Sequence, residues 1–274
     1  MFPGFSTQWK KCFHSVENPQ AASPRSGGAG FTVVELLVVL ATTALLTALL
    51  LGTYPAALGA ARSAACRSNL RQLAAANLAY AADHGRYVAA AADIATSTNN
   101  MRWHGVRVGG TFDGSLGPLA PYLGGGGASA WVRRCPGFKP DAEGFETSCG
   151  GYGYNALGVG SELCLPGNRV KTEFGMPPGA LARPAATVMF ADAAYLDGGG
   201  NKAKLIEYSF AEPPRFADGS VPDPTIHFRH RGRANVVWCD GHVSSETLAR
   251  TAGPAASRSL GWFGPADNEL FDPF

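Results

Sequence analysis

Charged residues are scarce in this sequence, and those that are present nearly cancel. They make up 16% of the 274 residues, against a usual share of about 25%. Lys and Arg number 23 and Asp and Glu number 21, which gives a formal net charge of +2. A balance this close to neutral argues against a basic surface for nucleic acid, so no nucleic acid partner is predicted.

Cysteine is also scarce, and Gly and Pro are not abundant enough to indicate disorder. Six Cys in a chain of this length are too few for a scaffold built on disulfides. The 35 Gly and 19 Pro together remain below the share of roughly 25–30% that marks low-complexity disorder. The chain is therefore expected to fold, with many loops, into one or two domains.

No charged residue occurs from Leu36 to Ala61, a run of 26 positions. A helix that spans a membrane needs about 20 predominantly apolar residues, so we predict a transmembrane segment over about 33–53. It forms the first half of one helix predicted over 31–84, since helical patterning continues until Gly85. The alternatives are a buried core helix and the apolar region of a secretory signal, which is usually about 7–15 residues long.

The residues before this segment account for the whole formal charge. Residues 1–30 contain three basic residues and one acid, namely Lys10, Lys11, Arg25 and Glu17. A positive flank favours retention in the cytoplasm. We therefore expect a single-pass protein with a cytoplasmic N-terminus and an exported C-terminal part.

One acid, Glu35, interrupts the apolar run. An acid within a membrane helix costs about 2.5–3.5 kcal/mol on insertion scales, and such residues are normally paired and functional. One interpretation places Glu35 at the membrane interface. The other requires a cation, and cleavage after Gly30 would supply it, because the new amine of Phe31 would lie four positions before Glu35 on the same helix face.

The segment from Gly30 to Leu40, GFTVVELLVVL, closely resembles the cleavage and methylation motif of type IV prepilins. Gly30, Phe31 and Glu35 all match that motif, which has Glu at the fifth mature position. The resemblance implies cleavage between Gly30 and Phe31 by a prepilin peptidase, N-methylation of Phe31, and packing of the helix into a filament core. It also implies that Glu35 meets the terminal amine of an adjacent subunit. The 30-residue leader is long for a type IVa pilin.

The second half of the predicted helix has a face of apolar and small residues. Their spacing of three to five predicts packing against a globular head. These residues are Leu58, Ala61, Ala65, Leu70, Leu73, Asn77 and Tyr80. The stretch 69–73, followed by Tyr80 and by 85–87, also resembles the pseudopilins of bacterial type II secretion.

Residues 85–274 are predicted to form the exported head. Short apolar runs between turn residues predict strands over 186–191 and 201–210, and 124–127 is expected to form a flexible glycine break. The predicted fold class is therefore α+β, with the long N-terminal helix packed on a loop-rich head of small antiparallel sheets.

The clearest strand pattern surrounds Asp240-Gly241. Two strand-like runs, 234–239 and 242–245, flank this dipeptide and predict a hairpin. We expect a type I′ turn, because both central residues of that turn need positive φ and Asp-Gly suits them. Val243 is then expected opposite Trp238 across the two strands.

Nine residues separate His230 from Asp240-Gly241. This H-x9-DG arrangement resembles the C-terminal signature of a large class of bacterial pilin-like proteins that carry the same N-terminal motif. The resemblance covers about 28–90 and 185–245. Together with the N-terminal motif, it implies a bacterial inner-membrane subunit whose head is periplasmic.

Several residues of ligand type prompt a search for a metal or catalytic site. They are Asp192, His230, Cys239 and His242. A single Cys-x-x-His without a second pair is weak evidence for zinc, so neither a metal nor another cofactor is predicted. Calcium remains an alternative with Asp192, Asp197 and Asp218 as candidates, although no EF-hand spacing is present. The absence of a G-x-S-x-G motif argues against a hydrolase.

Five cysteines remain after the predicted cleavage, and an exported location permits disulfides. Cys149 and Cys164 bracket a loop rich in Gly and Tyr and are the nearest pair in sequence. We expect a bridge between them. The odd count leaves at least one thiol over, for which Cys66 on the helix is the candidate.

The sequence therefore predicts a structural subunit of a type IV pilus or type II secretion-like filament, and not an enzyme. Its expected partners are a prepilin peptidase, other pilin or pseudopilin subunits and an inner-membrane assembly platform. One alternative is an exported enzyme or binding module that uses the anchor, with chemistry at His230, Asp240 and His242. A further alternative is a minor tip subunit, against which the presence of Glu35 weighs.

Overall fold

The computed structural model describes residues 30–96, 98–124, 132, 134–165, 167, 172–199, 202–216 and 218–274. The predicted leader lies outside the described residues except for Gly30, and so does most of the predicted break at 124–127. The chain divides into two compact units, Met1–Leu51 and Gly52–Phe274.

The first long element is α1, Val33–His84. Its length and end agree with the predicted helix, and it continues through Pro55. Gly85 follows with φ +73°, the left-handed geometry that commonly ends helices. Within the first unit the apolar side chains are exposed, and this part of α1 is long and apolar enough to cross a membrane.

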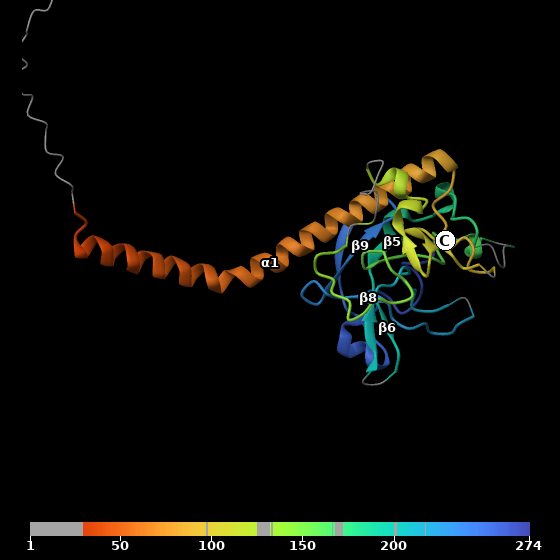
Figure 1. The fold of residues 1–274 in the computed structure, drawn as a ribbon. Coiled ribbons are helices and arrows are strands. Elements are labelled where there is room, and N and C mark those ends of the chain that lie inside the picture. The colour runs from red at the N-terminus through yellow and green to blue at the C-terminus, as the bar shows by residue number, and fades with distance from the viewer. Residues whose placement is uncertain are drawn as a thin grey trace, which may run out of the picture. The chain divides into compact units, whose positions relative to one another are not determined.

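The second half of α1 packs on the head within the second unit (Figure 1). Its buried residues follow one face, namely Cys66, Leu70, Leu73, Ala74, Ala76, Asn77 and Ala81. The prediction was wrong for Ala61 and Ala65, which are exposed. Ala65 lies five residues before Leu70 and is therefore rotated about 140° away from it. Cys66 occupies the buried face at this level.

Within the described residues, the largest sheet has four antiparallel strands in the order β10-β9-β5-β4. Their bounds are β4 Tyr152–Tyr154, β5 Val188–Asp192, β9 Arg233–Trp238 and β10 Val243–Thr247. Both faces of the central strands are buried. Leu70 and Leu73 of α1 share one core with Phe190, while Phe263 and Phe271 share another with Val236. Burial on both sides explains why β5 is apolar over 188–191 and why β9 ends in the apolar run 236–238.

Smaller elements surround this sheet and α1. The strands are β1 Met101–Arg102, β2 Gly105–Val108, β3 Thr111–Asp113, β6 Tyr195–Asp197, β7 Lys204–Ile206, β8 Ile226–His227 and β11 Leu260–Gly261. The short 3-10 helices are η1 Gly114–Leu116, η2 Ala120–Tyr122, η3 Glu162–Cys164, η4 Pro178–Ala180, η5 Pro184–Ala186 and η7 Gly253–Arg258. The layout is α+β, as predicted. The run predicted over 201–210 contributes only β7.

The predicted hairpin is present as β9 and β10, but its turn differs from the expected type. The backbone N–H of Gly241 donates to the carbonyl of Trp238 at 2.9 Å, and Gly241 has φ +89° while Asp240 does not have positive φ. This is the longer loop in which a left-handed Gly follows the turn. The added residue shifts the register, so Val243 pairs with Val237 instead of Trp238.

A turn with positive φ at both central residues does occur, ahead of β9. Arg231 has φ +57° and Gly232 has φ +77°. The N–H of His230 donates to the carbonyl of Arg233 at 2.9 Å, and the return bond is 3.2 Å long. These are the features of a type I′ turn, and they fix His230 at the entrance to β9.

Candidate functional site

The first candidate region is the N-terminal motif, where Glu35 caps its own helix. The Glu35 carboxylate accepts hydrogen bonds from the Thr32 N–H and hydroxyl, both at 2.9 Å. The Thr32 hydroxyl in turn accepts from the Glu35 N–H at 3.2 Å. This reciprocal arrangement is a capping box. The Thr-x-x-Glu pattern in the sequence is the signal that predicts it.

Gly30 and Phe31 precede this cap, and both are exposed. The capping box gives Glu35 a local partner in an uncut chain. The contact between Glu35 and a terminal amine therefore stays a prediction, and so do cleavage and methylation.

The second candidate region is the H-x9-DG signature, whose parts have different surroundings. Asp240 Oδ1 accepts from the backbone N–H of His242 at 3.0 Å and lies 2.6 Å from Nδ1 of the same His. Both side chains are partly exposed. His230, in contrast, is buried. Asp240 and Gly241 therefore shape the turn, and His230 belongs to another group of residues.

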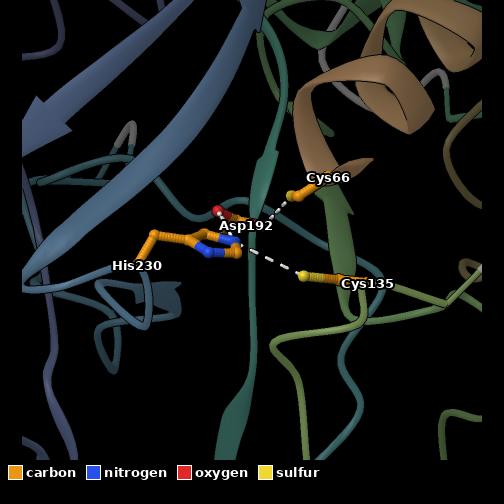
Figure 2. A group of neighbouring side chains, drawn as sticks. All are labelled: Cys66, Cys135, Asp192 and His230. Atoms are coloured by element: carbon orange, nitrogen blue, oxygen red, sulfur yellow. Dashed lines mark hydrogen bonds and ion pairs between the residues drawn. The ribbon is translucent and has the colours of Figure 1, made fainter. Parts of the chain in front are cut away.

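That group is a buried cluster of two thiols, a carboxylate and an imidazole (Figure 2). Its four potential ligand atoms all lie within 4.8 Å of one another. The side chains converge from α1, the loop before β4, the end of β5 and the turn before β9; they are Cys66, Cys135, Asp192 and His230.

The contacts inside this Cys-Cys-Asp-His cluster are short. The thiol of Cys66 donates to Asp192 Oδ1 at 3.0 Å. His230 Nε2 lies 3.3 Å from Asp192 Oδ2 and 3.4 Å from the Sγ of Cys135. One nitrogen of His230 thus faces two other members of the cluster.

Asp192 is held by further donors around the cluster. Arg229 Nη2 lies 2.6 Å from Asp192 Oδ1, and the backbone N–H of Asn235 donates to Oδ2 at 2.7 Å. The guanidinium of Arg229 also lies 4.8 Å from the centre of the Phe138 ring. Burial opposes ionisation of Asp192, but Arg229, His230 and Cys66 together outweigh it and keep the pKa of this carboxyl below its usual value. The buried charge is therefore paired, as buried charges need to be.

The other members of the cluster have shifted pKa values. Burial raises the pKa of the Cys66 thiol. The nearby thiol of Cys66 lowers the pKa of Cys135, and the hydrogen bond with His230 and the positive charge of Arg229 lower it further. Burial would lower the pKa of His230, but its hydrogen bonds to Asp192 and Cys135 raise it to about 9.

The expected disulfide between Cys149 and Cys164 is not formed, because both are free cysteines in the structure. Cys149 is fully buried with its Sγ 3.6 Å from a carboxylate oxygen of Glu207. Cys164 lies in η3 and donates to the carbonyl of Leu157 at 2.9 Å. Their separation in sequence was short, but each thiol is held by a different part of the head.

The structure brings together only some of the residues singled out as ligands. Asp192 and His230 belong to the Cys-Cys-Asp-His cluster, but Cys239 and His242 do not. The calcium candidate Asp218 instead accepts hydrogen bonds from Ser220. Cys66 and Cys135 were missed as ligands, since each is a lone cysteine far in sequence from Asp192 and His230.

An apolar pocket of about 260 Å³ lies elsewhere in the head. Tyr208, Phe210 and Phe216 contribute to its wall beside Glu212. Burial raises the pKa of Glu212 to about 7. The Tyr208 hydroxyl donates to Glu212 Oε1 at 3.1 Å, which only partly offsets this burial.

Comparisons with known proteins identify no relative. No protein-family model, no curated protein and no solved structure matches the chain.

Proposed function

We propose that this chain is a pilin-like or pseudopilin subunit that is processed by a prepilin peptidase and assembled into a filament. The observation that carries the proposal is a single helix with two different environments. Over Val33–Leu51 the large apolar side chains of α1 are exposed, while Cys66, Leu70 and Leu73 of the same helix are buried in the head.

Exposed apolar surface of this extent needs a covering, because water does not solvate it favourably. A bilayer covers it before assembly, and neighbouring copies of the helix cover it in a filament core. A helix suits both environments, since backbone polar groups in lipid must be satisfied within the segment. The threonines fit as well: the Thr43 hydroxyl donates to the Val39 carbonyl at 2.8 Å.

In this proposal the first residues of α1 have distinct roles. Gly30 is the cleavage position, Phe31 becomes the methylated N-terminus, and Glu35 pairs with the amine of an adjacent subunit. The partners are a prepilin peptidase, other pilin or pseudopilin subunits and an inner-membrane assembly platform. Before assembly the head faces the periplasm.

Processing is tested by N-terminal mass spectrometry of the full chain from bacterial membranes with and without a prepilin peptidase. We expect a peptide that begins with N-methylated Phe31 only when the peptidase is present. Gly30→Val should abolish cleavage. The matched control is Gly52→Val, because an added Cβ meets no atom within 4 Å at either glycine.

The outcomes separate the proposal from its main alternative. Retention of the intact N-terminus in the membrane fraction, despite an active peptidase, would contradict it. That result would favour a permanently anchored binding module or enzyme. Equal cleavage of the Gly30→Val variant and the wild type would also contradict the assigned processing site.

A further inference from the structure

We propose that the head binds one zinc ion at the Cys-Cys-Asp-His cluster, as a closed structural site that joins α1 to the sheet. The ligand atoms are two thiolate sulfurs, one carboxylate oxygen and one imidazole nitrogen. They belong to Cys66, Cys135, Asp192 and His230. This inference rests on the cluster alone and does not depend on the proposed filament function.

The distances fit a tetrahedral ion. With ordinary zinc bond lengths, a tetrahedral site separates sulfur from nitrogen by about 3.5 Å and nitrogen from oxygen by about 3.3 Å. The corresponding distances are 3.4 Å from Cys135 Sγ to His230 Nε2 and 3.3 Å from His230 Nε2 to Asp192 Oδ2. The widest separation of any two ligand atoms is at most 4.8 Å, so contraction by about 1 Å or less completes a tetrahedron with a sulfur–sulfur edge of about 3.8 Å.

The charges balance in the buried site. Without metal, the negative Asp192 is paired with the positive Arg229. Zinc binding requires two thiolates and a neutral imidazole, so two protons in total leave Cys66, Cys135 and His230 for solvent. The two negative thiolate charges then match the two positive charges of the ion. The site therefore stays neutral in both states, and this avoids the large cost of an unpaired buried charge.

The donor set and its surroundings indicate zinc in a structural role. Two thiolates and an imidazole suit zinc better than a hard cation such as calcium. Four protein ligands leave no open position for catalysis. Arg229 and the backbone N–H of Asn235 hold the Asp192 carboxylate, as outer partners commonly hold metal ligands. Gly137 permits the close approach, since an added Cβ would lie 2.9 Å from His230 Cε1.

A disulfide between Cys66 and Cys135 is the competing chemistry, because both thiols are buried in one cluster. It would use only two of the four converging groups. In the structure the Cys66 thiol is directed at Asp192 and the Cys135 sulfur at His230. The convergence of a carboxylate and an imidazole on the same point favours a metal.

The site is tested on the full chain purified in detergent under reducing conditions. After exposure to zinc and removal of excess ion, elemental analysis should give about one zinc per chain, as expected for a four-ligand site. Replacement by cobalt should produce the visible absorption of a tetrahedral ion together with thiolate charge-transfer bands. Chelation should lower the melting temperature of the wild type, and added zinc should restore it.

Variants then identify the ligands. Cys66→Ser and Cys135→Ser should each reduce bound zinc at least tenfold, and Cys149→Ser and Cys239→Ser serve as controls because they remove buried thiols outside the cluster. The wild-type measurements do not depend on whether the variants fold. Wild-type chain that binds no zinc would overturn the proposal, and so would peptides from cells in which Cys66 and Cys135 are linked by a disulfide.

Discussion

Asn77 offers the sharpest test of how α1 is held on the head. It is fully buried, and its Oδ1 accepts the N–H of Val88 at 2.9 Å. Its Nδ2 donates to the Tyr154 hydroxyl at 3.0 Å, which itself donates to the carbonyl of Val88 at 3.1 Å. This small network connects α1, the chain that follows it and β4. We predict that Asn77→Leu destabilises the head.

The expected loss of stability follows from the polar groups that lose their partner. Leucine is close to asparagine in size, so the main change is the lost polar contacts. The Val88 N–H would become a buried donor without a partner, which costs about 1–3 kcal/mol, and the lost bond to Tyr154 adds about 0.5–1.5 kcal/mol. A total of about 2–4 kcal/mol lowers the melting temperature of a domain of this size by about 5–15 °C.

The assay is unfolding of the detergent-purified chain followed by tryptophan fluorescence. Gln72→Leu is the matched control, because Gln72 lies on the exposed face of the same helix. A double-mutant cycle with Tyr154→Phe should show coupling of about 0.5 kcal/mol or more, since the two side chains are in direct contact. If Asn77→Leu melts at the wild-type temperature, the network does not hold α1 and the reasoning fails.

Two further predictions concern buried acids. Burial raises the pKa of Glu212 to about 7, so the unfolded chain loses this proton at a lower pH than the folded chain does. The free energy of unfolding should therefore fall by at most about 3 kcal/mol as pH rises from about 4.5 to 7. Glu212→Gln should remove that fall in urea unfolding measured across this range, and a variant that keeps the wild-type pH profile would contradict the raised pKa. The Glu146 carboxylate lies 2.9 Å from the guanidinium of buried Arg102. Glu146→Gln leaves that buried charge unpaired and should lower the free energy of unfolding by about 3–5 kcal/mol in the same assay. Glu269→Gln breaks the partly exposed pair of Glu269 with Arg183 and should lower the free energy of unfolding by less than about 1 kcal/mol. Equal losses from Glu146→Gln and Glu269→Gln would show that burial does not decide the strength of these ion pairs.

The elements with strong local patterns were predictable from the sequence. The uncharged run, the later helical spacing and Gly85 together located the end of α1, because helix length and termination depend on local residues. The β9–β10 hairpin was predictable for the same reason. Its register was not, since a single added turn residue moves every pairing by one position.

The Cys-Cys-Asp-His cluster was not predictable, because its members are brought together only by tertiary packing. Cys66 and Asp192 are separated by 126 positions, and no spacing rule connects them. A short separation in sequence instead predicted a disulfide between Cys149 and Cys164, which are held by different partners in the structure. Even the turn that positions His230 is inconspicuous, because Arg231 adopts positive φ, which is uncommon for a residue other than Gly.

The role proposed for Glu35 in filament assembly depends on its charge, which must be separated from its role as a helix cap. Glu35→Gln removes the charge but keeps an acceptor for the Thr32 N–H, since Gln also serves at this position of a capping box. Thr32→Val removes the hydroxyl part of the cap but keeps the charge. Glu35→Ala removes both the charge and the acceptor.

The decisive measurement is the yield of filaments from cells that contain the prepilin peptidase and assembly machinery, with membrane insertion of each variant as the control. We predict that Glu35→Gln and Glu35→Ala insert normally and form no filaments, whereas Thr32→Val assembles. Wild-type filament yield from Glu35→Gln would contradict the account, because it would show that Glu35 serves only to cap its helix.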